Sequence, residues 1–309
     1  MKKENRKKIL FLDVDGTLVH AARDEYIPES AIQAIRTARR MGHLVFLCTG
    51  RSKAEIYPKI YEIGIDGVIG AAGGFIEVID RVSGEEKEIF HRTIAAESAA
   101  EIAAYLDEHG IDYYMECNEG LYASCNLIPH IRQVLGGNGH FINSLKTGGA
   151  PAELDINKIS FLETNGSHYQ DVYDRFHEDF YMVRCTVPDF GEESGEISVK
   201  GINKSTAIHT LLDYLEQEEP VYTERMFHTE RMFHTLAIGD GMNDVEMFQA
   251  VDVAIAMGNA KEGLKELADY VTTDILEDGI YNAFRHFGLL EEEDLPERNS
   301  GMLAERKGI

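Results

Sequence analysis

The 309-residue sequence contains few cysteines, few prolines and few basic residues. Its four cysteines show neither the paired spacing of a metal site nor a disulfide-dense pattern, which predicts reduced thiols and a cytoplasmic protein. Seven prolines and 28 glycines exclude a collagen-like or low-complexity chain. The 30 basic residues are outnumbered by 54 acidic ones, and the formal net charge of −24 repels nucleic acid and anionic membranes at long range. We therefore expect neither of them as a partner.

Long apolar runs are absent as well. No 18 consecutive residues are apolar, so the sequence predicts no membrane-spanning helix. The basic segment Lys2–Lys8 leads into apolar residues 9–12, but Asp13 ends this run far short of the apolar region of a secretory signal. We interpret the basic segment as a solvated leader.

The chain has enough length for about two domains, and 44% hydrophobic residues supply a buried core. Near both ends, short apolar runs alternate with helical patterns, which is typical of an α/β fold with a parallel, doubly wound sheet. The strands predicted in this way are 8–12, 44–48, 67–70, 234–238 and 253–256, and the helices are 28–41, 53–63, 242–250, 261–267 and one that Asn203 caps and whose buried stripe ends at Leu215.

The pattern changes near the Gly73-Gly74 pair and resumes its alternation at Gly195. Between these points the strands are predicted to pair across short turns, and the helix near 168–180 is amphipathic. The predicted pairs are 75–80 with 86–90 and 111–117 with 121–124. We therefore predict a core of residues 1–80 and 190–290, an inserted α+β domain of residues 81–189, and a flexible tail of residues 291–309.

A six-residue sequence occurs twice in tandem, as Thr223–His228 and Thr229–His234. Two copies of so short a period do not make a solenoid, and the second copy leads into a predicted strand. We expect the first copy to lengthen a surface loop, rather than His228 and His234 to bind a metal.

The first segment with chemical potential is Asp13-Val14-Asp15-Gly16-Thr17-Leu18, directly after the first predicted strand. Ligand sites of open parallel sheets lie at the carboxyl ends of the strands. Two carboxylates two residues apart repel each other unless a cation or a proton neutralises them, and such oxygen ligands suit Mg²⁺. An ordinary Asp-Gly turn after a buried strand explains the same residues equally well.

Three more segments lie at equivalent places. Thr49, Gly50 and Arg51 follow the second strand and precede a helix, which is typical of an anion site. Lys204 lies in the first turn of a helix, where its charge opposes the helix dipole and indicates an anionic partner. Gly239-Asp240-Gly241-Met242-Asn243-Asp244 follows another apolar strand. Each segment alone fits a cap, a solvated lysine or a turn, but together they supply the groups that phosphoryl transfer with Mg²⁺ requires.

These four segments resemble the four ordered motifs of the haloacid dehalogenase (HAD) superfamily. The sequence is most similar to the Cof-type branch (subfamily IIB) of cytoplasmic phosphatases, which have a Rossmann-like core and a large inserted cap of the C2 type. Gly201–Ser205 is similar to the third motif of that branch, and the resemblance covers about residues 8–287. Many relatives have an Asn-Gly pair before the cap, where this chain has Ala71-Ala72-Gly73-Gly74.

The resemblance implies a role for each motif residue. Asp13 is the expected nucleophile, forming an aspartyl-phosphate, and Asp15 the expected general acid and base. Asp13, Asp240 and the backbone carbonyl of Asp15 are expected to hold Mg²⁺. Thr49, Gly50, Lys204 and Asn243 are the expected phosphate-binding residues, and Asp244 supports the site from behind. The cap is expected to move on hinges near Gly73-Gly74 and Gly191–Gly195.

The activity expected from this resemblance is hydrolysis of a small phosphomonoester: a sugar phosphate, a nucleotide or a cofactor phosphate. A phosphosugar mutase of the same superfamily is one alternative, but it has to hold a bisphosphate, and no dense arginine cluster occurs between residues 81 and 189. A phosphate-accepting signalling or binding module is a second alternative. Such a module is shorter and has no large insert, and a second acid two residues after the acceptor is not expected there.

Overall fold

The computed structural model describes residues 7–20, 25–135, 140–164, 166, 168–185, 190–218 and 233–290. The basic leader up to residue 6, the expected tail 291–309 and most of the tandem repeat, with His228, lie outside these ranges. Of the repeat, His234 is described; it begins a strand, and its Nδ1 lies 3.3 Å from Oδ2 of Asp252. Among the described residues no helix combines the length and the apolar character needed to cross a membrane.

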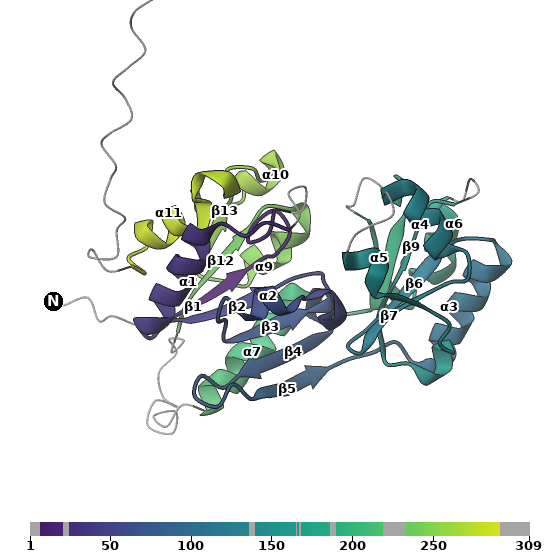
Figure 1. Ribbon diagram of the computed structural model, residues 1–309, viewed down its shortest axis with the longest axis horizontal. Coiled ribbons are helices and arrows are strands. Elements are labelled where there is room, and N and C mark those ends of the chain that lie inside the picture. The colour runs from purple at the N-terminus through teal and green to yellow at the C-terminus, as the bar shows by residue number, and fades with distance from the viewer. Residues whose placement is uncertain are drawn as a thin grey trace, which may run out of the picture.

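The chain forms two sheets with helices packed on them, and Figure 1 shows them as two bodies joined near β4 and β5. The order of the eight-stranded sheet is β14 (Tyr270–Val271), β13 (Val253–Ala256), β12 (His234–Gly239), β1 (Lys8–Leu12), β2 (Leu44–Cys48), β3 (Gly67–Gly70), β4 (Phe75–Ile79) and β5 (Glu86–His91). The order of the six-stranded sheet is β10 (Phe180–Arg184), β11 (Gly195–Val199), β9 (Ile156–Phe161), β6 (Tyr113–Cys117), β7 (Gly120–Ala123) and β8 (Leu145–Thr147).

The eight-stranded sheet is the predicted doubly wound core. Its first six strands are parallel, with Leu10 opposite both Leu236 and Val45, and β4 and β5 add an antiparallel hairpin. Strand β1 is fully buried after its first residue because helices cover both faces of a parallel sheet. The chain leaves β1 toward β2 and returns through β12 on the other side, so the strand order reverses at β1. Such a reversal is where ligands bind in open α/β sheets.

The helices of the core follow the predicted apolar patterns. They are α1 (Glu29–Arg40), α2 (Pro58–Tyr61), α7 (Lys204–Glu218), α9 (Val245–Gln249), α10 (Glu262–Lys265) and α11 (Gly279–His286), with 3₁₀ helices η2 (Lys53–Glu55), η3 (Ala71–Gly73), η6 (Met242–Asp244) and η7 (Ile275–Glu277). Helix α1 packs against α11, and α7 packs against α9 and the β3–β4 pair. The predicted stripe of α7 is buried at Ile208, Leu211 and Leu212.

One predicted helix is broken in two. The apolar pattern over residues 53–63 gives η2 and the single turn α2, with extended backbone at Ile56 and Tyr57 between them. Pro58 has no N–H to continue a helix, and its ring disfavours the helical conformation of the residue before it. The prediction of one continuous helix over residues 53–63 is therefore wrong.

Strands β5 and β11 lie in a different sheet from the one that the sequence analysis predicts for them. Strand β5, assigned to the inserted domain from residue 81 onward, pairs with β4 and extends the core sheet. Strand β11, where the alternation was expected to resume, pairs antiparallel with β9 and β10. Gly195, one of the expected hinge glycines, therefore lies inside the second sheet. The predicted pairing of 75–80 with 86–90 is confirmed, and it places β5 in the core sheet, whereas the pairing of β11 with the distant strand β9 is not encoded in local patterning.

We call residues 92–199 the inserted unit. Its helices are α3 (Ala96–Glu108), α4 (Leu127–Leu135), α5 (His140–Ser144) and α6 (Tyr169–Phe176), with the 3₁₀ helix η4 (Pro151–Glu153). Its two connections to the core meet at the glycine pair: Gly74 O accepts a hydrogen bond from Arg92 N, and a Cβ on Gly73 would collide with the carbonyl of Asn203. Glycine is therefore required at residue 73, where φ is also +109°.

His43 makes the stability of the core sensitive to acid. Its ring is 2% exposed, and its Nδ1 accepts a hydrogen bond from the backbone N–H of Lys8 at 3.2 Å. Burial, together with the nearby charges of Lys8 and Arg81, lowers the pKa of His43 from 6.5 to about 4. The neutral ring is thus favoured in the folded protein, whereas the unfolded chain takes up a proton below about pH 6.5.

We expect this histidine to contribute stability that is fully present above pH 6.5 and is lost as the pH falls toward 4, by about 3 kcal/mol at most. Urea unfolding of the wild type and His43→Gln between pH 4 and 7 measures it. The variant should show the shallower dependence on pH, and His168→Gln, at an exposed histidine, should match the wild type. Equal slopes for wild type and His43→Gln would contradict the assignment.

Candidate active site

Asp13 is held at the carboxyl end of β1. Its N–H donates to Ile238 O of β12 at 3.0 Å, and the residue is 5% exposed. The chain then turns at Gly16, where φ is +84° and a Cβ would collide with the carboxylate of Asp240. Thr17 Oγ1 donates to Asp240 Oδ1 at 3.0 Å. Glycine at residue 16 therefore lets the loops after β1 and β12 approach each other closely.

Lys204 reaches Asp13 from the opposite side of the site. It is the first residue of α7, which Asn203 caps by accepting a hydrogen bond from Thr206 N at 2.9 Å. Although Lys204 is only 2% exposed, its Nζ lies 2.7 Å from Asp13 Oδ1 and 2.6 Å from Asp244 Oδ1. Burial by itself would lower the pKa of Lys204, but the two carboxylates raise it above its ordinary value. The lysine therefore remains charged.

The segment after β12 brings the carboxylates of Asp240 and Asp244 close together. Asp244 is fully buried, and its Oδ2 accepts hydrogen bonds from the N–H groups of Asp240 at 3.0 Å and Gly241 at 3.1 Å. Carboxylate oxygens of Asp13, Asp240 and Asp244 lie within 4.8 Å of one another. Burial raises the pKa of Asp240 to about 6, and burial and the charge of Asp244 raise that of Asp13 as well. A hard divalent cation would relieve this repulsion.

The segment after β2 lies beside this cluster. Thr49 is 1% exposed, and its Oγ1 accepts a hydrogen bond from Arg51 N at 3.1 Å. The Arg51 guanidinium donates to both oxygens of Asp15, at 2.9 and 2.7 Å. The side chain of Asp15 is half exposed and points to Arg51, so it is Asp244 that completes the carboxylate cluster. Although Asp15 is paired with Arg51, its charge still contributes to raising the pKa of Asp13 and of Asp240.

The structure brings together most of the predicted residues and adds others. Asn243 is exposed, its Oδ1 lies against Gly241, and none of the described hydrogen bonds joins it to the carboxylates. Asn259 was not predicted: its Nδ2 donates to Gly16 O at 2.8 Å, and its Oδ1 accepts from Ile275 N at 3.0 Å. No local pattern marks this asparagine. Thr17 and Arg51, by contrast, stand within the quoted motifs, and their hydroxyl and guanidinium were available as signals.

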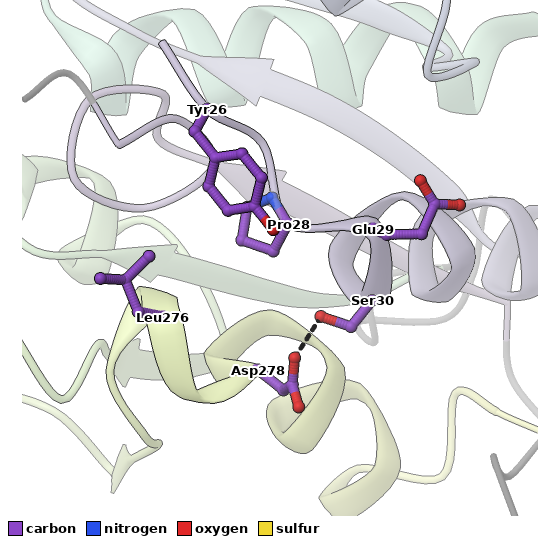
Figure 2. Close-up of a pocket in the computed structure, with 6 residues that line it drawn as sticks. All are labelled: Tyr26, Pro28, Glu29, Ser30, Leu276 and Asp278. Atoms are coloured by element: carbon purple, nitrogen blue, oxygen red, sulfur yellow. Dashed lines mark hydrogen bonds between the residues drawn. The ribbon is translucent and has the colours of Figure 1, made fainter. Parts of the chain in front are cut away.

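An open cavity of about 410 Å³ lies elsewhere, at the surface of the domain that holds the eight-stranded sheet (Figure 2). Tyr26 and Pro28 line it on one side and Leu276 on the other, and Ser30 Oγ donates to Asp278 Oδ1 across it at 2.6 Å. None of its lining residues belongs to the carboxylate cluster. The hydrogen bond ties the start of α1 to the start of α11, so we assign this cavity no part in the chemistry.

Comparison with known proteins agrees with this arrangement. Residues 10–284 match the family model of the haloacid dehalogenase-like hydrolases. The chain belongs to this family. It is 27% identical over 289 residues to a putative phosphatase, YkrA, of Bacillus subtilis, covering 92% of this chain and 99% of the relative. The phosphatase YwpJ of the same organism is 23% identical, covering 90% of this chain and 99% of the relative.

A solved structure supports the same placement within the HAD family. This chain is similar to a sugar phosphatase of HAD subclass IIB, with a TM-score of 0.70 and 26% identity, covering 92% of this chain and 100% of the other. The chain is thus a HAD phosphatase of the Cof type, and the expected Rossmann-like core with an inserted α+β unit is confirmed.

The Lys204 bridge is expected to stabilise this HAD phosphatase strongly. Lys204→Met leaves two buried carboxylates without their cation, which typically costs about 3–5 kcal/mol. Urea unfolding of the metal-free protein at pH 7 measures the loss. The double variant Lys204→Met/Asp244→Asn removes the repulsion as well and should recover part of it. A stability equal to that of the wild type in the single variant would contradict a charged lysine between the two carboxylates.

Proposed function

We propose that this HAD phosphatase hydrolyses small phosphomonoesters with Mg²⁺ and forms an aspartyl-phosphate on Asp13. The observation that carries the proposal is the cluster of Asp13, Asp240 and Asp244 with Lys204 at the carboxyl ends of the core strands. It combines carboxylates for a cation, a buried ammonium for phosphoryl oxygens and a nucleophile in one place.

The donor set fits a hard divalent cation. Both oxygens of Asp244 already accept hydrogen bonds, Oδ1 from Lys204 and Oδ2 from two backbone N–H groups. Asp244 therefore positions its neighbours. Asp13, Asp240 and the backbone carbonyl of Asp15 would hold Mg²⁺, which when bound supplies positive charge beside the phosphoryl oxygens.

Asp13 suits the part of the nucleophile. Lys204 binds its Oδ1, whereas none of the described residues donates a hydrogen bond to its Oδ2. Oδ2 attacks phosphorus in line, and the ester oxygen leaves with a proton from Asp15. Asp15 then takes a proton from water, which attacks the aspartyl-phosphate and releases inorganic phosphate. Because Arg51 holds both oxygens of Asp15, this pair has to loosen for the proton to move.

The remaining predicted residues belong to phosphate binding. Thr49, the N–H of Gly50 and the ammonium of Lys204 are assigned to the phosphoryl oxygens, and Asn243 to their outer side. The inserted unit acts as the cap that contacts the leaving group. A small phosphorylated metabolite is the proposed substrate.

Phosphate release from a panel of phosphomonoesters tests the activity. We expect many turnovers with Mg²⁺, none with EDTA, and a loss of about 10⁴-fold or more in kcat for Asp13→Asn. Asp213→Asn, at an exposed aspartate of α7, is the matched control and should keep the wild-type rate. A folded protein that releases phosphate from none of the esters would overturn the proposal.

The covalent route has its own test. Asp15→Asn can still form the aspartyl-phosphate from p-nitrophenyl phosphate, whose leaving group needs no proton, but it cannot activate water for the second step. We expect a burst of p-nitrophenol and a protein heavier by one phosphoryl group in intact-protein mass spectrometry. Slow turnover with neither burst nor adduct would argue for direct attack by water.

A further inference from the structure

The sheet of the inserted unit has one apolar and one polar face. Residues of β6, β9 and β11 alternate between them. Facing α3 and α6, which lie on the side away from the core in Figure 1, are Met115, Cys117, Ile159, Phe161 and Ile197. The opposite face carries Glu116, Lys158, Ser160, Glu196 and Ser198, with Glu116 opposite Lys158 and Ser160 opposite Glu196 in the sheet register.

The polar face points toward the carboxyl ends of the core strands, where the proposed active site lies. Lys158 Nζ donates to the carbonyl of Gly50 at 3.3 Å, in the loop assigned to the phosphate. Further along the same face, the Tyr181 hydroxyl donates to Glu246 Oε1 of α9 at 3.4 Å. A leaving group attached to a phosphate at Gly50 therefore lies against this face.

The charges on this face are buried. The side chains of Lys158 and Glu116 are 6% and 0% exposed, and that of Glu196 is 25% exposed. Lys158 Nζ lies 3.4 Å from Glu116 Oε1 and 3.0 Å from Glu196 Oε2, and Ser160 Oγ donates to Glu116 Oε1 at 2.6 Å. Glu116 Oε2 is buried as well and has no hydrogen-bond partner among the described residues. Burying these charged groups costs more free energy than burying apolar side chains in their place. Such a set of buried charges therefore indicates that this face binds a ligand.

The charged side chains on this face carry a net negative charge. One ammonium, that of Lys158, faces the carboxylates of Glu116 and Glu196, and the field of Glu55 from η2 reaches Glu116 too. Burial raises the pKa of Glu116, and the charge of Glu55 adds to this effect while Lys158 opposes it. Even with Glu116 protonated, the ammonium of Lys158 stays paired with the carboxylate of Glu196, and the set carries no excess positive charge. A second anionic group on the leaving group would therefore be repelled, whereas hydroxyl or amine groups find acceptors.

We infer that Glu116, Lys158 and Glu196 bind the leaving group and select phosphomonoesters whose leaving group carries hydroxyl or amine donors and no second negative charge. This inference rests on the proposed phosphatase reaction at Asp13. It adds the residues that choose among substrates and the charge rule by which they choose.

Three esters of equal chain length test the rule. They are glucose 6-phosphate, glucosamine 6-phosphate and 6-phosphogluconate, whose leaving groups are neutral, cationic and anionic. We expect the wild-type kcat/KM for the first two to exceed that for 6-phosphogluconate by about tenfold or more. A preference for 6-phosphogluconate would overturn the inference.

Charge-neutral variants show which residues impose the preference. In Glu116→Gln/Glu196→Gln, the ratio of kcat/KM for glucose 6-phosphate to that for 6-phosphogluconate should fall to about one-tenth of its wild-type value. In Glu196→Gln alone, at the partly exposed residue, the same ratio should also fall. This single variant replaces the double variant if the latter does not fold. Glu97→Gln, which removes one negative charge at an exposed residue of α3, is the control for the single variant and should keep the wild-type ratio. An unchanged ratio in both test variants would overturn the assignment.

Binding separates this inference from the proposed reaction. Calorimetric titration of Asp13→Asn with the same three esters measures charge preference without turnover. If the wild type hydrolyses neither these esters nor p-nitrophenyl phosphate, the reaction is wrong, and the order of binding still decides the inference. Equal binding of all three esters, or binding of none, would overturn it.

Discussion

The ammonium of Lys204 between Asp13 and Asp244 is the interaction on which the site depends. Each of the three groups is costly to bury alone, and together they hold the start of α7 against the loops after β1 and β12. Lys204 binds Oδ1 of Asp13, and none of the described residues donates a hydrogen bond to Oδ2. The chemistry proposed for Asp13 would therefore use an ion pair that also stabilises the fold. Asp244 completes it by binding the backbone N–H groups that shape the last loop.

The inserted unit uses strand alternation for two purposes. One face of its sheet packs on α3 and α6 and supplies the hydrophobic core of the unit. The other carries Glu116, Lys158 and Glu196 next to the loop of Gly50, although burial there would favour apolar residues. At its edge the same face turns apolar, and Ala54 of η2 packs with Tyr114 and Leu121. The inserted unit therefore contacts the core through apolar residues that lie beside the charged residues of the same sheet face.

Most of the fold could be read from local pattern. The buried parallel strands appear as apolar runs, and Asn203 and Gly42 stand where helix ends require them. The prediction was wrong where an adjacent residue or a paired strand determines the structure. Pro58 divides a helical pattern that is otherwise regular. Strand β5 pairs with β4 as predicted and therefore belongs to the core sheet, whereas β11 pairs with β9 of the inserted unit.

The sequence by itself determined the acids of the site. Parallel strands bring their carboxyl ends to one edge, so Asp13 and Asp240 had to lie close together once their strands were recognised. Only the tertiary structure decided which carboxylate completes the cluster: Arg51 draws Asp15 away, and Asp244 takes its place. It alone also placed Asn259 under Gly16, and Lys158 over Gly50. These contacts join side chains from separate elements, and the distance between such atoms depends on how whole layers pack, which no local spacing encodes.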